Sequence, residues 1–336
     1  MKSIWQGKHG PLLIAEIGGN HEGDFEYAMQ LTELALEADV DYIKYQIYQG
    51  DTLVSREESP QRNQHFKKFE LSPEQYISIA QYCQTHGVGF LASVWDPAYF
   101  SWIDSYIDFY KIGSGDLTAY PILKATANQR KPILLSTGLA TLDEVLSSVQ
   151  YLQSVNEMYL DSGNLALLQC TSMYPIPFSD AHLSVMSLYQ QTTGLPIGYS
   201  DHTEGTLALE VAVAMGARVL EFHFTDTRAG KAFRDHQVSL TKDEVGYLIG
   251  RISEIQALQG DSLKRPLPIE ADHRVSFRRA VYPRIDLPKG TQITEEHVTC
   301  LRPNHGIDAR DFDQLLGKTL LVDVKVHQKL EWSYFK

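Results

Sequence analysis

The sequence predicts an α/β protein, a (β/α)8 TIM barrel followed by a small β-rich domain. Eight short apolar runs alternate with amphipathic stretches over about 260 residues, which is the usual size of such a barrel. The Gly-rich first turn of a doubly wound nucleotide-binding sheet is absent. From Ser276 the alternation ends, and short β-type runs separated by turns rich in Pro and Gly replace it.

The predicted strands are the short apolar runs at 12–17, 42–48, 89–94, 109–112, 132–136, 165–170, 196–199 and 219–223. The clearest predicted helices are 24–38, 72–86 and 241–258. The helix after the fifth strand begins with Thr141 and Glu144, which form a capping-box pattern. A polar insertion, 51–70, separates the second strand from its helix. This order predicts eight strand–helix units that close into one barrel.

The predicted domains are a barrel over 1–258, a linker over 259–275 and a small β-rich domain over 276–336. The linker is polar and carries Pro266 and Pro268. The last segment has about 60 residues, which is marginal for independent stability. We therefore expect it to pack on another surface.

Composition excludes several classes of partner. The formal net charge of -12 argues against nucleic acid and against an anionic membrane surface. Cys83, Cys170 and Cys300 show no disulfide-framework spacing, which fits a reducing compartment. No signal peptide and no run long enough to span a bilayer are apparent. We expect a cytoplasmic protein.

Two histidines, His202 and His223, each follow a short apolar run. If those strands are neighbours in a parallel barrel, both imidazoles lie at the end where barrels place their chemistry. Two neutral imidazoles suit Mn, Fe, Co or Zn. The alternative is two unrelated histidines, each hydrogen-bonded to its neighbours, because no HExxH or CxxC spacing is present.

Polar residues are concentrated at the predicted strand ends. Glu16 is a carboxylate in an apolar strand, which is costly to bury without a partner or a function. Lys44 and Gln46 point the same way at period two. Together with Lys111 and the hydroxyls and glycines after the later strands, they predict a phosphate or carboxylate site.

The alternative to an anion site is a Lys44–Glu16 ion pair with ordinary N-caps at Ser114 and Thr137. Lys111 could also form a Schiff base, as in barrel aldolases. A lone Cys170 is more often a small buried side chain than a nucleophile.

Seven ordered motifs resemble those of the sialic acid synthase family. They are Ala15-Glu16-Ile17-Gly18-Gly19-Asn20-His21-Glu22-Gly23, Lys44-Tyr45-Gln46, Lys111-Ile112-Gly113-Ser114-Gly115, Leu135-Ser136-Thr137-Gly138, Cys170-Thr171-Ser172-Met173-Tyr174-Pro175, Ser200-Asp201-His202-Thr203 and Glu221-Phe222-His223-Phe224-Thr225-Asp226. The tail from Arg278 to Lys318 is similar to that family's antifreeze-like (SAF) domain. Together these motifs are far more specific than any single one.

The resemblance implies condensation of phosphoenolpyruvate (PEP) with an N-acetylated amino sugar, giving a nine-carbon 2-keto sugar acid and phosphate. It implies a divalent metal, Mn²⁺ first and Mg²⁺ or Co²⁺ as alternatives, on His202 and His223. It also implies a domain-swapped homodimer in which Arg302 reaches the partner's active site.

The resemblance also assigns site residues. The implied PEP-binding residues are Lys44, Gln46, Ser93, Lys111, Ser114, Ser136 and Ser200. The implied catalytic residues are Glu16, Lys111, Asp116 and Asp235. The implied sugar-binding residues are Glu16, Tyr174, Asp235 and Arg302. The register of the insertion 51–70 stays open, and Asn63 is a candidate sugar contact there.

The chain departs from the family pattern at four places. They are Asp116 for Glu, Ser93-Val94 for Thr-Pro, Phe233-Arg234 for Gly-Pro, and Asn304 for the Gly after Arg302-Pro303. Three of the four fall on the expected sugar side, so the acceptor stays open between N-acetylmannosamine and a 2,4-diacetamido-2,4,6-trideoxyhexose. A non-catalytic sugar-binding protein on a synthase scaffold is a further alternative.

Overall fold

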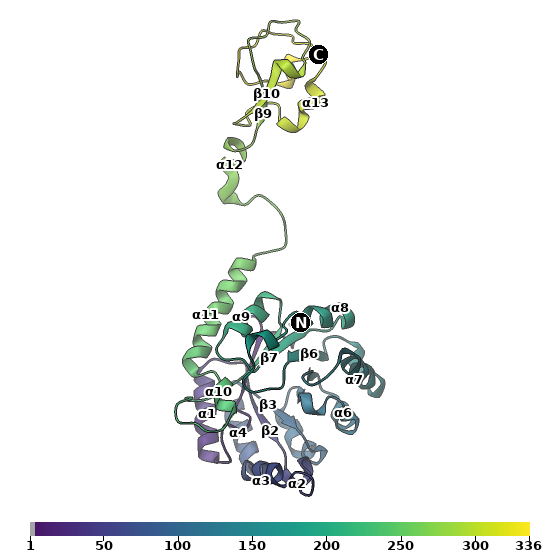
Figure 1. Ribbon diagram of the computed structural model, residues 1–336, viewed down its shortest axis with the longest axis vertical. Coiled ribbons are helices and arrows are strands. Elements are labelled where there is room, and N and C mark those ends of the chain that lie inside the picture. The colour runs from purple at the N-terminus through teal and green to yellow at the C-terminus, as the bar shows by residue number, and fades with distance from the viewer. Residues whose placement is uncertain (1–3) are drawn as a thin grey trace. The chain divides into compact units, whose positions relative to one another are not determined.

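The computed structural model describes residues 4–336 and divides the chain into two compact units, Met1–Gly260 and Asp261–Lys336. The first unit is a closed barrel of eight parallel strands surrounded by helices (Figure 1). The second contains a small two-stranded antiparallel sheet. The predicted fold class is therefore confirmed.

The barrel strands agree with the predicted ones to within two residues at each end. They are β1 Leu12–Glu16, β2 Tyr42–Ile47, β3 Gly89–Val94, β4 Tyr110–Ile112, β5 Ile133–Ser136, β6 Leu165–Cys170, β7 Ile197–Asp201 and β8 Val219–His223. β1 pairs in parallel with both β2 and β8, which closes the barrel. Side chains alternate along each strand, so those of β2 divide between the interior and the helices. Tyr45 points outward, and its hydroxyl donates to the carbonyl of Ala28 on the first helix at 2.9 Å.

The surrounding helices cover the outer face of the strands (Figure 1). They are α1 Phe25–Glu37, α4 Pro73–Thr85, α5 Phe100–Ile103, α6 Tyr120–Ala127, α7 Leu142–Val155, α8 Val185–Thr193, α9 Leu207–Ala214 and α11 Lys242–Gln259, and the short α10 Asp235–Val238 lies in the segment between β8 and α11. The capping box predicted at Thr141 and Glu144 is present at the start of α7. Each buried helix face packs on the strands in one continuous hydrophobic core.

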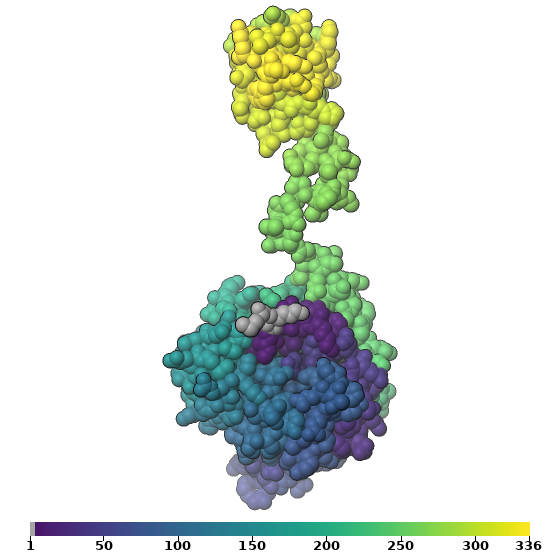
Figure 2. All heavy atoms as spheres, turned by 180° about the vertical axis from the view of Figure 1, so that it is seen from behind, coloured from purple at the N-terminus to yellow at the C-terminus, as the bar shows by residue number. Residues whose placement is uncertain are grey.

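The amino-terminal segment packs where the strands begin. The ring of Trp5 lies edge-on to Phe109, with centroids 5.3 Å apart, just before β4. Figure 2 shows this purple segment beside the green α11, where the Gln256 side chain donates to the His9 carbonyl at 3.0 Å. This end of the barrel is thus closed by packed side chains, and the opposite end is left to the strand-to-helix loops.

The polar insertion forms two helices that sequence analysis did not predict, α2 Gly50–Leu53 and α3 Pro60–Lys68 (Figure 1). We call residues 50–70 the α2–α3 lobe. The buried Asn63 amide donates to the carbonyls of Gly50 at 2.9 Å and Val54 at 2.8 Å. Asn63 therefore stabilises the lobe from within, and its amide is used in this structural role.

The second unit contains β9 Ala280–Pro283 and β10 Val298–Leu301, which pair antiparallel, with α12 Ala271–Ser276 and α13 Phe312–Leu315. It has a small hydrophobic core of its own that includes Val281, Leu315 and Leu330. The segment predicted as a linker contains most of α12. Within residues 4–336, no helix is long and apolar enough to cross a membrane.

Candidate active site

A cavity of about 1050 Å³ opens where the barrel strands end. All the predicted site residues of the barrel line it. They are Glu16, Lys44, Gln46, Ser93, Lys111, Ser114, Asp116, Ser136, Tyr174, Ser200, His202, His223 and Asp235. Arg302 lies in the second unit, just after β10, with its guanidinium 5.7 Å from the centre of the Phe277 ring. The structure thus brings together thirteen of the fourteen predicted positions.

Strand register places these side chains next to one another. Glu16 is level with Lys44 on one side and with His223 on the other. Ser93 is level with Gln46 and with Lys111. Because adjacent residues in register point to the same side of a sheet, the polar groups form one continuous layer inside the barrel.

Four buried charges occupy the floor of this cavity. The Lys44 ammonium lies 2.6 Å from Glu16 and 3.9 Å from Glu221. Lys111 lies 3.4 Å from the same Glu221 oxygen. The Lys44–Glu16 ion pair considered as an alternative is present, but it forms part of a larger cluster in which two ammonium groups face one open cavity.

Glu221 was not among the predicted site residues. Its signal was available: it is a carboxylate in an apolar strand, two residues before His223 and so on the same face. Ser200 donates a hydrogen bond to it at 3.2 Å. The contact between Glu221 and Ser200 depends on the strand register, because the two residues are paired on the neighbouring strands β7 and β8.

Burial and neighbouring charges oppose each other within the cluster. Burial would raise the pKa of Glu221, but Lys111 and Lys44 outweigh it and hold that pKa below its usual value. Burial lowers the pKa of Lys111, which Glu221 only partly opposes. For Lys44 the same burial is outweighed by Glu16 and Glu221, so its pKa is raised. Lys44 is therefore the more firmly charged of the two lysines.

Hydroxyl groups surround the lysines. Ser93 accepts a hydrogen bond from Lys44 at 3.5 Å, and Ser114 accepts one from the Gly138 amide at 3.0 Å. Ser136 is buried, and within the described chain its hydroxyl has no hydrogen-bond partner. A buried hydroxyl without a partner is costly unless a ligand satisfies it. The predicted alternative of N-caps at Ser114 and Thr137 is wrong, because Thr137 donates to the Leu168 carbonyl and Thr141 caps the helix.

The two histidines are neighbours, with ring centroids 5.4 Å apart. His202 donates through Nδ1 to the Thr171 carbonyl at 2.7 Å, which leaves Nε2 free to bind a cation. Nδ1 of His223 is buried and has no hydrogen bond in the described chain, and it lies 4.0 Å from the Asp235 carboxylate. No group of three His, Cys, Asp or Glu side chains suited to a metal occurs in residues 4–336. A cation held by this pair would therefore have two protein ligands, His202 and His223, and its other coordination positions would be left to other groups.

The protonation of the pair differs. Burial lowers the pKa of His223 well below its usual value, so this ring is neutral and able to ligate. Burial also opposes protonation of His202, but Cys170 and the Thr171 carbonyl outweigh it and raise that pKa to about 9. Because metal ligation requires a deprotonated ring nitrogen, binding of a cation at His202 would release a proton.

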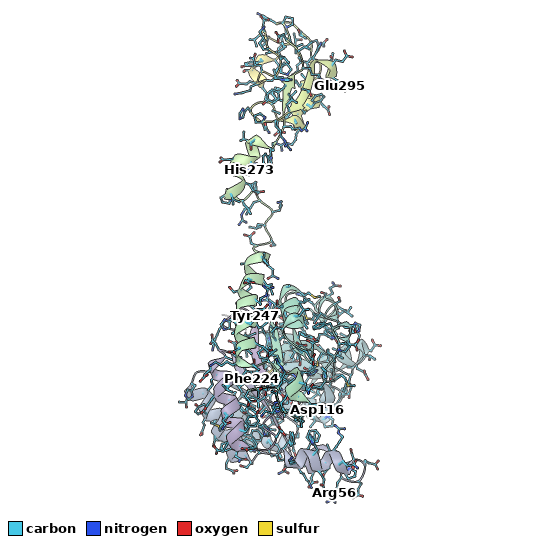
Figure 3. All side chains as sticks on the ribbon, turned by 60° about the vertical axis from the view of Figure 1, so that its left-hand side comes forward. Arg56, Asp116, Phe224, Tyr247, His273 and Glu295 are labelled. Carbon is cyan, nitrogen blue, oxygen red and sulfur yellow. The ribbon has the colours of Figure 1, made fainter. Side chains whose placement is uncertain are left out.

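Further carboxyl groups lie on the expected sugar side. Burial raises the pKa of Asp235, and the Arg234 guanidinium, which donates to it at 3.0 Å, opposes that shift. Arg234 also lies 4.5 Å from the centre of the Tyr174 ring. Burial raises the pKa of Asp116 to about 6. Figure 3 labels Asp116 in the barrel unit, and Arg56 on the α2–α3 lobe.

The remaining wall of the cavity is aromatic, and sequence analysis missed it. It comprises Tyr48, Phe66, Phe69, Trp95 and Phe233, which we call the aromatic wall. Arg62 and His65 line the cavity beside it. Asn63 lies between them in sequence but does not line the cavity, so the structure does not place this candidate sugar contact at the cavity surface.

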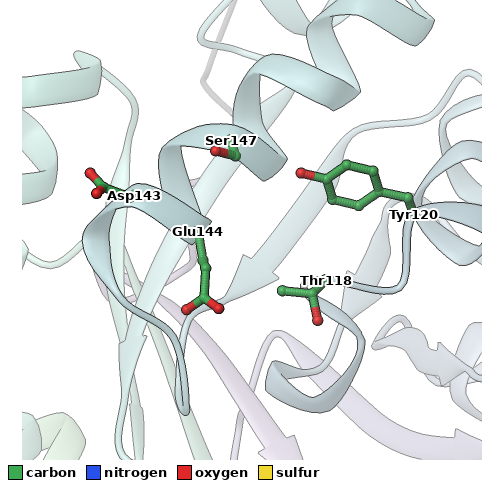
Figure 4. A pocket seen from close by; sticks show the side chains of 5 residues that line it. All are labelled: Thr118, Tyr120, Asp143, Glu144 and Ser147. Atoms are coloured by element: carbon green, nitrogen blue, oxygen red, sulfur yellow. The ribbon is translucent and has the colours of Figure 1, made fainter.

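A second hollow, of about 290 Å³, lies where α6 and α7 begin (Figure 4). It is lined by Thr118, Tyr120, Asp143, Glu144 and Ser147. Glu144 is engaged in the capping box of α7. None of the lining residues is a cation or a histidine, so the hollow lacks the groups that the barrel cavity combines.

The chain is similar to known proteins over most of its length. The NeuB family matches residues 31–264, and the SAF domain matches residues 278–335. N,N'-diacetyllegionaminic acid synthase of Legionella pneumophila is 32% identical, over 96% of this chain and 94% of that protein. N-acetylneuraminate-9-phosphate synthase of Mus musculus is 32% identical, over 95% of this chain and 91% of that protein. The crystal structure of N-acetylneuraminic acid (sialic acid) synthetase from Leptospira borgpetersenii, in complex with citrate, is similar with a TM-score of 0.72 at 27% identity, covering 78% of this chain and 89% of that one.

Proposed function

The chain belongs to the NeuB family and carries a SAF domain, and from this membership we propose the reaction that its barrel cavity performs. It is an enzyme, and its relatives include synthases of N,N'-diacetyllegionaminic acid and of N-acetylneuraminate 9-phosphate. The reaction that we propose for it is a transfer that joins PEP to an N-acetylated amino sugar. The products are a nine-carbon 2-keto sugar acid and phosphate. The observation that carries the proposal is the pair of buried lysines that faces the open cavity beside the two histidines.

PEP carries a phosphate and a carboxylate, so it needs cations and hydrogen-bond donors at short range. We assign this binding to Lys44 and Lys111. The supporting donors are Gln46, Ser93, Ser114, Ser136 and Ser200. The unpartnered hydroxyl of Ser136 supports the assignment, because an anion would satisfy it. Glu16 and Glu221 balance the lysines before PEP arrives, and PEP would compete with them for the two ammonium groups.

The reaction forms a bond between C3 of PEP and the aldehyde carbon of the open-chain acceptor. Water supplies a hydroxyl to C2 of PEP, and the C2–O bond to the phosphate then breaks, which leaves the ketone. The aldehyde oxygen takes up a proton. Glu16, Asp116 and Asp235 are the carboxyl groups assigned to these proton movements, and the raised pKa of Asp116, about 6, suits proton exchange near neutral pH.

His202 and His223 are assigned as ligands of a divalent cation, Mn²⁺ first and Mg²⁺ or Co²⁺ as alternatives. When bound, the cation supplies Lewis-acid polarisation of the acceptor aldehyde. The protein prepares the site by fixing the His202 ring through the Thr171 carbonyl and by keeping His223 neutral. Two residues are assigned to the acceptor sugar: Asp235, 4.0 Å from His223, and Tyr174, whose ring is tilted against that of His202 with centroids 4.0 Å apart.

The test is phosphate release from PEP with Mn²⁺, across N-acetylmannosamine, its 6-phosphate and a 2,4-diacetamido-2,4,6-trideoxyhexose, with a chelator control. We expect release with at least one acceptor, abolished by chelation. Binding of an acceptor without turnover would instead indicate a non-catalytic sugar-binding protein. Absence of release, with metal retained by a His202→Ala variant, would overturn both the reaction and the metal ligands.

A Schiff-base lyase using Lys111 is the competing enzyme class, and the lowered pKa of Lys111 is what such a lysine needs. Glu221, 3.4 Å away, favours the charged form and so favours an anion-binding role. Borohydride treatment with a 2-keto acid distinguishes the two. Covalent labelling of Lys111 would support the lyase, and we expect none.

We further propose a homodimer in which the SAF domain of one chain covers the barrel cavity of its partner, so that Arg302 contacts the acceptor sugar. Leu139, which lines the cavity and is 78% exposed, offers an apolar surface for such a cover. Mixing Lys111→Ala with Arg302→Ala protein tests this. Mixed dimers would contain one site with both residues intact, so we expect partial recovery of activity. No recovery in demonstrated mixed dimers would contradict the swap.

A further inference from the structure

We propose that Phe233 and the side of α3 that lines the cavity together select the acceptor sugar. They favour an acceptor whose edge at this surface is uncharged and lacks a hydroxyl group, and they disfavour an acceptor that is phosphorylated there. The inference rests on the proposed function and narrows its acceptor class. The favoured acceptor is an N-acylated amino sugar with a methyl group where other amino sugars carry a hydroxymethyl or phosphorylated carbon.

The first support is the continuity of the aromatic wall. Tyr48 and Trp95 stack with centroids 5.1 Å apart, and Phe66 meets Tyr48 edge-on at 5.2 Å. Phe69 and Phe233 meet edge-on at 5.0 Å. Rings in such contact present an extended apolar surface. Burying a methyl or acyl group against this surface is favourable, whereas burying a charged or hydroxyl group there removes its hydrogen bonds to water.

The His65 ring joins the two halves of the wall. Its centroid lies 4.4 Å from Phe69, 5.7 Å from Phe66 and 5.8 Å from Phe233. The loop after β8 is thereby attached to the α2–α3 lobe, although the two are far apart in sequence. A ligand at this wall would contact both segments at once.

Phe233 also packs against the backbone of the loop after β1. A Cβ added at Gly19 would lie 3.1 Å from the Phe233 ring and 3.3 Å from Phe69. Close approach of the rings to this backbone therefore depends on glycine at position 19.

The charges of the cavity give the second support. Its lining cations are Lys44, Arg62, Lys111 and Arg234. PEP is assigned the two lysines, and Arg234 is held by Asp235 at 3.0 Å. Of these four side chains, Arg62 alone has no assigned partner; its guanidinium lies 5.9 Å from the centre of the Phe66 ring, and no carboxylate pairs with it in the described chain. The metal ion is assigned to the acceptor aldehyde and Arg302 to its sugar, so a phosphate monoester at the far edge of the acceptor would have Arg62 as its lysine or arginine partner in the barrel lining. It would also enter a cavity that already holds PEP and contains Asp116 and Asp235.

The experiment measures kcat and KM of the full-length protein with Mn²⁺ and saturating PEP. The acceptors are a 2,4-diacetamido-2,4,6-trideoxyhexose, N-acetylmannosamine and N-acetylmannosamine 6-phosphate. For the wild type we expect kcat/KM for the trideoxy acceptor to exceed that for the phosphate by at least about ten-fold, the effect of one well-placed apolar contact.

Variants locate the preference. Phe233→Gly is expected to raise KM for the trideoxy acceptor about ten-fold. KM for PEP, measured separately by varying PEP at saturating acceptor, is expected to stay within about two-fold. Phe233→Leu, which keeps apolar volume, is expected to retain most of the preference. Tyr247→Ala, at a 58% exposed tyrosine on α11, is the matched control and is expected to change neither constant.

Three results would contradict the inference. Preference for the 6-phosphate, with loss of that preference in Arg62→Ala, would overturn the inference and leave the synthase reaction standing. An unchanged acceptor preference in Phe233→Gly would also overturn it. No phosphate release with any acceptor would overturn the synthase reaction and the inference together. The wild-type preference requires no variant, so the test holds even if Phe233→Gly folds poorly.

Discussion

Replacing Glu221 by glutamine should destabilise the barrel without PEP and make PEP binding strongly stabilising. The substitution keeps the size of the side chain and its contact with Ser200, but it removes the charge between the two lysines. Lys44 keeps Glu16 as a partner at 2.6 Å. Lys111 loses the one carboxylate that lies within ion-pair distance of it in the described chain.

The magnitude follows from the distances. With an effective dielectric constant near 20, a charge pair at 3.4 Å attracts by about 5 kcal/mol and one at 3.9 Å by about 4 kcal/mol. Part of this is offset, because the carboxylate itself is costly to bury. Breaking a buried ion pair by removing one partner typically costs about 3–5 kcal/mol. At roughly 2–4 °C per kcal/mol for a domain of this size, the midpoint of thermal unfolding should fall by roughly 6–20 °C.

PEP should reverse much of this loss, because its anionic groups would take the place of the missing carboxylate beside Lys111. The assay is thermal unfolding with and without PEP, and we expect a larger upward shift in the variant than in the wild type. Glu57→Gln is the control, since Glu57 is 89% exposed and its ion pair with Arg56 is 3.9 Å long. A Glu221→Gln variant that unfolds within about 3 °C of the wild type would refute the reasoning.

Three further predictions concern the metal ligands, Asp116 and the lobe. His202→Ala or His223→Ala should lower Mn²⁺ affinity at least ten-fold, measured by metal content after gel filtration, whereas the exposed His86→Ala should not; equal metal in all three would exclude the pair as ligands. Burial raises the pKa of Asp116 to about 6, so the folded state binds this proton more tightly than the unfolded chain, and stability falls as pH rises from about 4 through 6. The free energy of unfolding of Asp116→Asn, measured by urea unfolding, should therefore rise relative to that of the wild type by roughly 1–3 kcal/mol between pH 4 and pH 8. A difference between the two proteins that does not change with pH would contradict this. Asn63→Ala should destabilise the α2–α3 lobe by about 1–3 kcal/mol, because the lost amide donates to one buried and one half-buried carbonyl; faster hydrogen exchange confined to the lobe is expected, and unchanged exchange would count against it.

The sequence alone was sufficient for the barrel and for most of its cavity. Alternating apolar and amphipathic runs reflect burial within each strand and helix, which is a local property. The period-two spacing of Lys44 and Gln46 predicted their common direction, and both line the cavity. Strand ends meet at one face of a parallel barrel, so residues such as Ser114 and His202 could be gathered into one site before any contact was known.

The tertiary structure alone decided which of these groups are partners. Glu221 lies beside Lys111 because of strand tilt and register, which are set by how eight strands close together and not by the spacing within any one of them. The contact of Phe233 with Phe69 joins segments more than a hundred residues apart, and the path of two loops determines it. The periodicity of a strand or helix is visible in residues that are close in sequence, whereas contacts across the barrel follow from the packing of the whole chain. The sequence therefore determined the fold and the chemical groups of the cavity, and the closed barrel decided their pairing.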